Sequence, residues 1–177
     1  TIVDYGSGNV LSAQKSFIKI AKDNNIEANV LISKKPNDVK NSTHIVLPGQ
    51  GAFSTCMNGL KKTNGLIDEL CEFALIKKKP FLGICVGMQM LAKTSEESGI
   101  HEGLGWIDGQ IKLLHGDNLK LPHMGWNLSI PTNSKYNNLI STKDDYYFVH
   151  SYYFDCADKD NILAETKYGI NFASIVG

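Results

Sequence analysis

The sequence predicts an α/β protein with a mostly parallel sheet covered by helices on both faces, followed by a β-rich C-terminal half. In the first half, strand-like and helix-like segments alternate at the spacing of βαβ units, which make their strands parallel. Beyond Gly103 the pattern changes to short β-rich segments separated by turn residues. The 177 residues, 42% hydrophobic and 20% charged, are enough to bury the core of a soluble globular domain.

The first half begins with a strand at residues 2–5 that runs into the turn Gly6-Ser7-Gly8. Asn9 is suited to cap the next helix, which extends to about Lys22, because its side chain can accept a hydrogen bond from a backbone N–H of the first turn. Further strands are expected at residues 29–32, 44–47 and 81–84, and further helices at residues 52–61 and 66–77.

The second half is expected to form strands at residues 107–113, 124–130, 146–154, 162–166 and 170–176. Asp117-Asn118 and Asn137-Asn138 are turn signals between these strands. No internal repeat or linker interrupts the chain, so the sequence predicts a single domain over residues 1–177.

The charges balance, with eighteen basic residues, all of them lysine, against eighteen acidic ones. Without a net field the chain has no electrostatic reason to bind nucleic acid or an anionic membrane. The lack of arginine weighs only weakly against a phosphorylated substrate, because a codon bias towards lysine and asparagine is the preferred explanation. No apolar run approaches the ~20 residues of a membrane span and no leader opens the chain, so we expect a cytoplasmic protein. The four cysteines form no C-x-x-C pair, and their spacing predicts neither a metal site nor a disulfide framework.

The most informative segment is Gly83-Ile84-Cys85-Val86-Gly87, at the end of an apolar run. A nucleophile on a sharp strand-to-helix turn needs neighbours without a Cβ two residues away on each side, and this spacing supplies them. At the first turn of the following helix, the free backbone N–H groups and the helix dipole are expected to favour the Cys85 thiolate. The alternative is a buried cysteine on a core strand.

A second glycine-rich turn, Pro48-Gly49-Gln50-Gly51, follows the strand at residues 44–47. In a parallel sheet its loop would lie at the same carboxyl edge as Cys85. Its backbone N–H groups and that of Val86 could then stabilise a tetrahedral oxyanion, although a simple turn before a helix is the alternative. Taken together, the two loops predict acyl transfer to a thiol.

The turn Gly6-Ser7-Gly8 has another interpretation, a dinucleotide-binding loop with Glu27 near the position of a ribose-binding acid. Leu11 occupies the place of the third glycine, so we expect a sharp turn that serves another purpose and no nucleotide cofactor. A general base is harder to assign. His123 and His150 flank aromatic segments and could approach the site, but their spacing selects neither.

Six sequence blocks resemble the class I, triad-type glutamine amidotransferases, and among them the glutaminase subunit of imidazole glycerol phosphate synthase. The resemblance spans nearly the whole chain and implies the flavodoxin-like fold of that family. The blocks are Asp4-Tyr5-Gly6-Ser7-Gly8-Asn9, Pro48-Gly49-Gln50-Gly51-Ala52-Phe53, Gly83-Ile84-Cys85-Val86-Gly87-Met88-Gln89, Glu102-Gly103-Leu104-Gly105-Trp106, Pro122-His123-Met124-Gly125-Trp126-Asn127 and Tyr147-Phe148-Val149-His150-Ser151-Tyr152.

The resemblance implies hydrolysis of the side-chain amide of L-glutamine through a γ-glutamyl thioester, without a cofactor or metal. The ammonia would pass through a tunnel to a (β/α)8 cyclase partner that makes imidazole glycerol phosphate and AICAR in histidine biosynthesis. By resemblance the nucleophile is Cys85, the oxyanion loop is Gly49, Gln50 and Gly51 with Val86, the substrate contacts are Gln89, His150, Ser151 and Tyr152, and the partner interface includes Trp126 and Asn127.

The sequence departs from the family pattern in two places. Gln50 stands where the family has a small apolar residue. In the family, the backbone N–H of that residue turns towards the oxyanion only when the partner has bound its own substrate. The family also completes its triad with a histidine and a glutamate in a His-Pro-Glu-Lys-Ser-like stretch after the segment at residues 170–176, whereas this sequence stops at Gly177. We therefore expect a trimmed chain that is impaired as it stands.

Three alternatives remain at this stage. One is a paralogous subunit that supplies ammonia for modification of a surface sugar, which the motifs of the site would not distinguish. Another is a non-catalytic docking subunit, if the triad residues are truly absent from the protein. A generic cysteine hydrolase is less favoured, because Gln89 and the run His150-Ser151-Tyr152 suit a glutamine pocket better than an open peptidase cleft.

Overall fold

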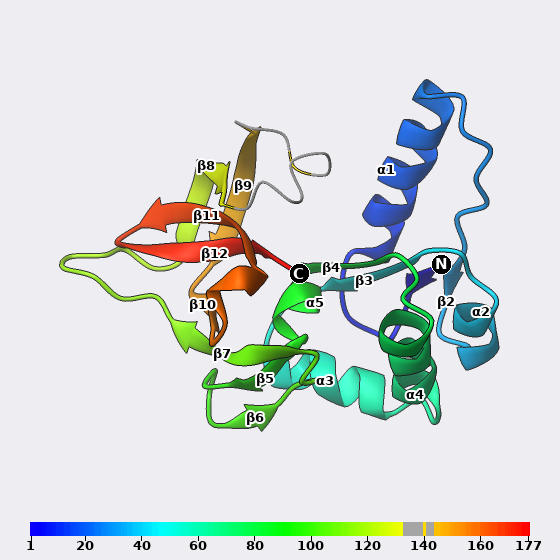
Figure 1. Cartoon of the computed structure of the whole chain (residues 1–177), viewed down its shortest axis with the longest axis horizontal. Helices are drawn as coiled ribbons and strands as arrows, with labels where there is room; N and C mark the ends of the chain where they lie inside the picture. The colour runs from blue at the N-terminus through cyan, green and yellow to red at the C-terminus, as the bar shows by residue number, and fades with distance from the viewer. Residues whose placement is uncertain (133–139, 141–143) are drawn as a thin grey trace. The chain divides into compact units, whose positions relative to one another are not determined.

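The computed structural model describes residues 1–132, 140 and 144–177, which form two compact units, Thr1–Met90 (unit 1) and Leu91–Gly177 (unit 2) (Figure 1). The expected turn at Asn137-Asn138 lies outside the described residues. The turn at Asp117-Asn118 is confirmed, with Asn118 at a φ of 57°.

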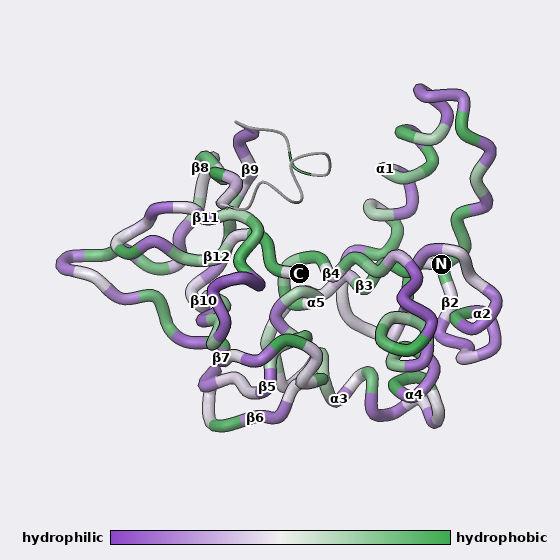
Figure 2. The backbone as a smooth tube through the Cα atoms, viewed as in Figure 1, coloured by the Kyte–Doolittle hydropathy of each residue, from purple (hydrophilic) through white to green (hydrophobic). Residues whose placement is uncertain are grey.

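Unit 1 is built on a four-stranded parallel sheet in which each strand pairs parallel with its neighbours. β3 lies inside the sheet and is buried along its whole length, because its run of aliphatic residues is covered on both faces. Figure 2 shows the same hydrophobic character along β3 and β4. The spatial order is β2 (Ile32–Ser33), β1 (Ile2–Val3), β3 (Ile45–Gly49) and β4 (Phe81–Cys85).

Helices cover both faces of this sheet, as the sequence predicts. α1 (Val10–Asp23) lies on one side, and the other side holds α2 (Pro36–Lys40), α3 (Phe53–Lys61) and α4 (Leu66–Cys71) (Figure 1). The expected cap of α1 is confirmed, since the Asn9 Oδ1 accepts a hydrogen bond from the Ser12 backbone N–H at 3.1 Å.

Some boundaries in unit 1 differ from the prediction. The strand expected at residues 29–32 is β2 at Ile32–Ser33, because β1 has only two residues to pair with it. α2 was not expected, and the helix predicted at residues 66–77 is α4 followed by a π-helical turn, Glu72–Ile76.

Unit 2 is an eight-stranded sheet that is antiparallel except for the pair β5 and β7. Its core includes Ile111, Leu114, Phe154 and Ala164. The spatial order is β6 (His101–Glu102), β5 (Ala92–Ser95), β7 (Ile107–Leu113), β10 (Tyr152–Cys156), β12 (Ile170–Val176), β11 (Ile162–Tyr168), β8 (His123–Pro131) and β9 (Asp144–His150).

Two predictions for this half were wrong in detail. The single strand expected at residues 146–154 is two strands, because the chain changes partners at Ser151: β9 pairs with β8, whereas β10 pairs with β7 and β12. The β-rich part also begins earlier than Gly103, since β5 and β6 precede it.

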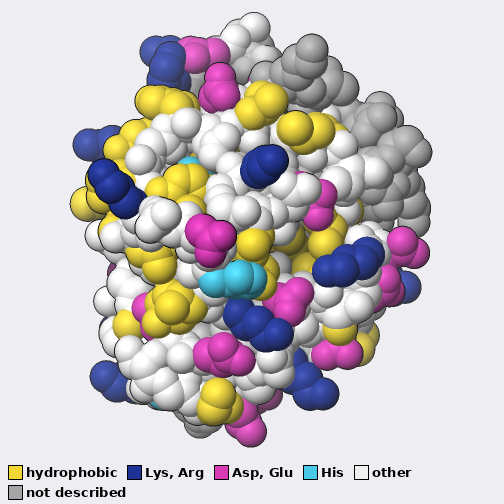
Figure 3. Space-filling model, turned by 90° about the vertical axis from the view of Figure 1, so that its left-hand side faces the viewer, with side chains coloured by type: hydrophobic (Ala, Val, Ile, Leu, Met, Phe, Trp, Pro, Cys, Tyr) yellow, Lys and Arg dark blue, Asp and Glu magenta, His cyan; other side chains and the backbone are white. Residues whose placement is uncertain are grey.

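The exposed charges are mixed in sign. On the face shown in Figure 3, lysines and carboxylates lie interspersed, in keeping with the balanced composition. Among the described residues, no helix is both long and apolar enough to cross a bilayer.

Candidate active site

Cys85 is the last residue of β4 and directly precedes the short helix α5 (Val86–Gln89). Its backbone has a φ of 56° and a ψ of −120°, a conformation that residues with a Cβ rarely adopt. Such strain persists only where the surrounding structure imposes it, and it is concentrated at functional sites. The predicted strand-to-helix turn is therefore present, and Cys85 is at its sharpest point.

Three glycines make this turn possible by allowing close backbone contact. A Cβ on Gly83 would lie 2.7 Å from the Gly87 carbonyl oxygen, and one on Gly87 would overlap the carbonyl oxygen of Leu47. A Cβ on Gly49 would lie 2.5 Å from the Gly87 backbone nitrogen. The two glycines that flank Cys85 are thus required by packing, as the spacing predicts.

The loop Pro48-Gly49-Gln50-Gly51 lies beside this turn. β3 pairs with β4 so that Gly49 is opposite Cys85 and Pro48 is opposite Ile84. Gly51 has a φ of 91°, which allows the chain to bend sharply before α3. The expected juxtaposition of the two glycine-rich turns at the carboxyl edge of the sheet is confirmed.

Residues that sequence reasoning did not select hold this loop in place. The Tyr5 hydroxyl donates a hydrogen bond of 2.6 Å to the Pro48 carbonyl oxygen, and the Cys56 thiol lies 3.5 Å from the Gln50 carbonyl oxygen, to which it donates. Gly8, at a φ of 97°, lets the first turn approach Pro48, since a Cβ there would lie 3.2 Å from that residue. The first glycine-rich turn therefore supports the second.

The electrostatics of Cys85 differ from the expectation of a favoured thiolate. Desolvation by the surrounding protein raises the pKa of the Cys85 thiol, and a hydrogen bond from the Val86 backbone N–H opposes this rise without reversing it. α5 has only four residues, so its dipole contributes little. The thiol therefore needs a base to take its proton.

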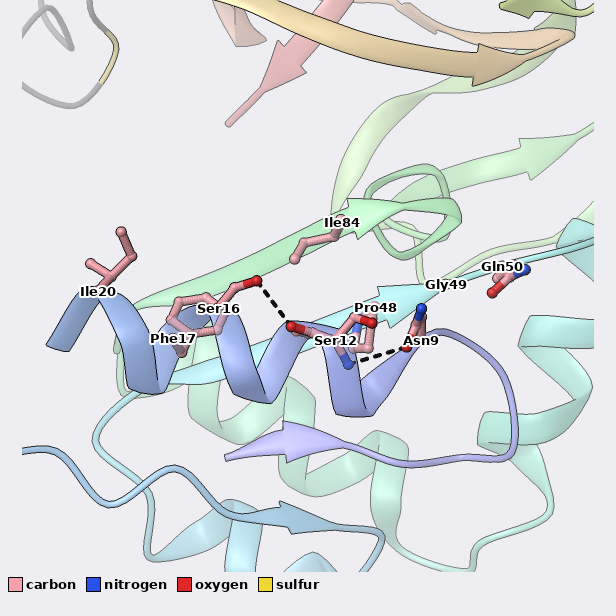
Figure 4. A pocket seen from close by; sticks show the side chains of 10 residues that line it. Asn9, Ser12, Ser16, Phe17, Ile20, Pro48, Gly49, Gln50 and Ile84 are labelled. Atoms are coloured by element: carbon pink, nitrogen blue, oxygen red, sulfur yellow. Dashed lines mark hydrogen bonds between the residues drawn. The ribbon is translucent and has the colours of Figure 1, made fainter. Parts of the chain in front are cut away.

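A cavity of about 540 Å³ opens next to the loop, between α1 and the carboxyl ends of β3 and β4 (Figure 4). Figure 4 shows Ser12, Ser16 and Phe17 on the helix side and Pro48 and Ile84 on the strand side. Gly49 and Gln50 also line it, whereas Cys85 does not. The cavity thus reaches the proposed oxyanion loop but not the sulfur.

In unit 2, the segment His150-Ser151-Tyr152 forms the corner between β9 and β10. The Leu114 backbone N–H donates to the Ser151 carbonyl oxygen at 2.8 Å. The His150 Nδ1 donates to the Tyr152 carbonyl oxygen at 2.9 Å, and its Nε2 lies 2.9 Å from the Nδ1 of His123. The two histidines that the sequence left open as bases are hydrogen-bonded to each other.

Trp126 and Asn127 are neighbours on β8, but their side chains have different surroundings. Trp126 is 72% exposed and packs edge-on against Tyr147, with 5.6 Å between ring centroids. The Asn127 amide donates to the Lys167 carbonyl oxygen at 3.1 Å, so it is held within the sheet.

Gln89, the last residue of α5, belongs to unit 1 together with Cys85. Within the described residues, no cluster of histidine, cysteine, aspartate or glutamate could hold a metal ion.

Comparison with known proteins identifies the family. Residues 1–176 match the family "Glutamine amidotransferase class-I", and the chain belongs to it. Two solved structures agree at the level of the fold. One glutamine amidotransferase aligns with a TM-score of 0.67 at 16% identity, over 98% of this chain and 88% of that chain. Another, from Thermotoga maritima, has a TM-score of 0.63 at 18% identity, over 99% and 72%.

Closer relatives by sequence share one name, imidazole glycerol phosphate synthase subunit HisH. The protein of Pelagibacter ubique is 44% identical over 99% of this chain and 85% of its own length. That of Rhodospirillum rubrum is 40% identical over 99% of this chain and 84% of its own length. The family resemblance and the α/β fold expected from the sequence are confirmed.

Proposed function

We propose that this chain hydrolyses the side-chain amide of L-glutamine and supplies the ammonia to an imidazole glycerol phosphate synthase in histidine biosynthesis. The observation that carries the proposal is Cys85, held at a φ of 56° beside the Gly49-Gln50-Gly51 loop. Membership of the class I glutamine amidotransferases and the 40–44% identity to HisH subunits support glutamine as the substrate of this thiol.

In the proposed reaction, the Cys85 sulfur attacks the amide carbon of glutamine after a base removes the thiol proton. The oxyanion accepts hydrogen bonds from the Val86 N–H and from the loop at Gly49, Gln50 and Gly51. The C–N bond then breaks and the proton returns to the leaving nitrogen, which departs as ammonia. Water cleaves the resulting γ-glutamyl thioester, which gives glutamate and restores the thiol.

The base is proposed to come from outside residues 1–177, in the histidine- and glutamate-bearing stretch that the family carries after the last strand. Its need is supported by the raised pKa of Cys85. His150 is a poor candidate because both of its ring nitrogens are hydrogen-bonded. A version extended by that stretch should hydrolyse glutamine about 10²–10⁴-fold faster than residues 1–177, and equal rates would contradict this assignment.

The substrate and partner contacts are proposed by resemblance. Gln89, Ser151 and Tyr152 would bind the backbone groups of glutamine. His150 stays a prediction as a substrate contact, since both of its ring nitrogens are hydrogen-bonded within unit 2. The partner is proposed to be a (β/α)8 cyclase that forms a cytoplasmic heterodimer with this chain and receives ammonia through a tunnel. It would cover the exposed Trp126. Asn127 stays in this interface as a prediction, since its amide is hydrogen-bonded within unit 2.

The oxyanion loop is also a proposed control point. If its inward N–H donor is turned away until the partner binds its own substrate, the resting subunit lacks one oxyanion contact. Losing one such donor typically costs ~10²–10³ in rate. The polar side chain of Gln50, and the Cys56 thiol that donates to its carbonyl oxygen, would set how easily this backbone turns.

The experiment is a glutamate-release assay on the full-length subunit alone, with the cyclase, and with the cyclase plus its nucleotide-derived ligand. We expect the rate to rise across the three conditions and to vanish in Cys85→Ser, while Cys71→Ser, a matched control near the end of α4, stays active. Free ammonia should still support the Cys85→Ser complex. Equal rates in all three conditions would contradict the gating, and an active Cys85→Ser protein would contradict the proposed function.

A further inference from the structure

A chain of hydrogen bonds in unit 2 links Asn127, His123, His150 and Tyr152, and its direction follows from the atoms. The Tyr152 carbonyl oxygen can only accept, so the His150 Nδ1 carries the hydrogen of their 2.9 Å bond. The Nε2 of a neutral His150 is then an acceptor, and the Nδ1 of His123, 2.9 Å away, must be the donor. The remaining nitrogen of His123, Nε2, accepts from the Asn127 Nδ2 at 3.2 Å.

The orientation of the Asn127 amide agrees with this direction. Its Nδ2 also donates to the Lys167 carbonyl oxygen at 3.1 Å, and its Oδ1 accepts from the Leu128 backbone N–H at 2.8 Å. Turning the amide over would place its oxygen against the Lys167 carbonyl oxygen, which are two acceptors. It would also place its NH2 group against the Leu128 N–H, which are two donors. The chain therefore runs one way, from Asn127 to Tyr152.

The four hydrogen-bonded residues, Asn127, His123, His150 and Tyr152, form a relay whose central residue, His123, lies in an aromatic cluster. His123 is only 3% exposed and stacks on Tyr168, with 4.0 Å between ring centroids, and on Phe148, with 5.0 Å. Phe172 contacts both imidazoles. Desolvation lowers the pKa of His123 and of His150, which favours the neutral imidazoles on which the hydrogen-bond directions are based.

These contacts end on the backbone of the corner between β9 and β10. His150 bonds a carbonyl only two residues along the chain, so the orientation of its ring and the local turn at Ser151 depend on each other. On its other side the ring is fixed by His123, which is paired with it across β8 and β9. We propose that His123 is a positioning residue that acts through His150 to set the backbone at Ser151 and Tyr152.

The inference rests on the proposed function, in which Ser151 and Tyr152 contact glutamine. It assigns His123 a role in glutamine binding without contact to the substrate. If His123 acted by packing alone, only its ring would be needed, whereas a positioning role needs its hydrogen-bond donor. Two substitutions separate these roles. His123→Phe keeps a stacking ring and removes the donor, whereas His123→Asn places an amide nitrogen close to the Nδ1 position and removes the ring.

The test is the glutamine kinetics of the full-length subunit in complex with its cyclase partner. We expect His123→Phe to raise the KM for glutamine roughly three- to tenfold, as the loss of one neutral hydrogen bond predicts, with a smaller change in kcat. His123→Asn should keep the KM within about twofold of the wild type even if its melting temperature falls. Tyr168→Phe is the matched control, because it keeps the stack and loses only the bond from the Tyr168 hydroxyl to the Lys120 carbonyl oxygen.

An unchanged KM in His123→Phe, or an equal increase in both variants, would overturn the inference. Either result is distinct from a failure of the proposed function, in which the wild-type complex would release no glutamate. A second measurement needs no variant to fold. Imidazole ¹⁵N spectra of the wild-type protein at neutral pH should show both histidines protonated on Nδ1 only, and protonation of either on Nε2 would overturn the relay.

Discussion

The two units hold their candidate site residues by different means. In unit 1, Cys85 and the loop at residues 48–51 are fixed by backbone packing, with Gly49, Gly83 and Gly87 so close to their neighbours that no Cβ fits. In unit 2, the corner at Ser151 has one backbone hydrogen bond, from the Leu114 N–H, and is otherwise held by side chains that reach it from β8 and β9. Contacts between backbones tolerate almost no change, whereas a side-chain relay can weaken by degrees. The comparison therefore predicts severe effects in unit 1 and graded ones in unit 2.

The largest effect is expected from Gly87→Ala. The new Cβ would overlap the carbonyl oxygen of Leu47 on β3, so the strand and the turn must separate, at a cost of about 3 kcal/mol or more in the free energy of unfolding. Gly6→Ala is the control, because Gly6 has a φ of 87° but open space around it, and strain alone costs about 1–2 kcal/mol. Urea unfolding followed by far-UV circular dichroism compares them. Equal losses would show that packing does not fix the turn.

Trp126→Ala should weaken partner binding by about 2 kcal/mol or more, because exposed aromatic residues at the centre of an interface commonly contribute that much. The unfolding free energy should change by less than about 0.5 kcal/mol, as for other surface substitutions. Titration calorimetry with the cyclase subunit measures the first quantity. Ile76→Ala, an equally exposed apolar position in unit 1, should bind normally. A Trp126→Ala protein that unfolds would instead place this side chain in the core.

Tyr5→Phe tests whether side chains matter in unit 1 as well. The change leaves the Pro48 carbonyl oxygen without its 2.6 Å hydrogen bond, which should cost about 1–3 kcal/mol of stability and lower kcat for glutamine hydrolysis. The ring itself remains, so cavity effects are absent. Tyr146→Phe, at a more exposed position, is the control. If kcat is unchanged while stability falls, Tyr5 supports the fold but not the oxyanion loop.

The smallest effect is a pH dependence confined to unit 2. His123 and His150 have folded-state pKa values below the ordinary histidine value near 6.5, so the unfolded chain binds more protons as the pH falls through that value. Stability should therefore decrease on acidification from pH 7 towards pH 5. Both tryptophans lie in unit 2, so their fluorescence reports its unfolding. His123→Phe should flatten the dependence, and a slope identical to that of the wild type would assign it to other groups.

The sequence predicted the parts of the site that depend on local chain geometry. The glycines around Cys85 have a steric reason that can be recognised from their spacing, and parallel pairing brings the loop after β3 to the same edge. Tyr5 and Cys56 left no such signal, because a tyrosine after a short strand and a cysteine in an amphipathic helix are ordinary core residues.

The hydrogen bonds of the relay could not be predicted from the sequence, for another reason. His123 and His150 are 27 positions apart, and their contact depends on the register between β8 and β9. The break at Ser151 was missed because residues on both sides favour strands, and only the exchange of pairing partners divides them. The thiolate expectation found no support, because α5 is a single turn and desolvation raises the pKa of the Cys85 thiol more than the Val86 N–H lowers it.

The most direct test of Cys85 as the nucleophile is to treat the protein with an electrophilic analogue of glutamine and map the adduct by mass spectrometry. Cys56 and Cys156 are buried, and burial raises the pKa of Cys156 to about 11, whereas the partly exposed Cys71 serves as an internal control. We expect one adduct, on Cys85, which forms faster as the pH rises because the thiolate is the reactive form, and which excess L-glutamine prevents. Labelling of Cys56, Cys71 or Cys156 with Cys85 unmodified would contradict it.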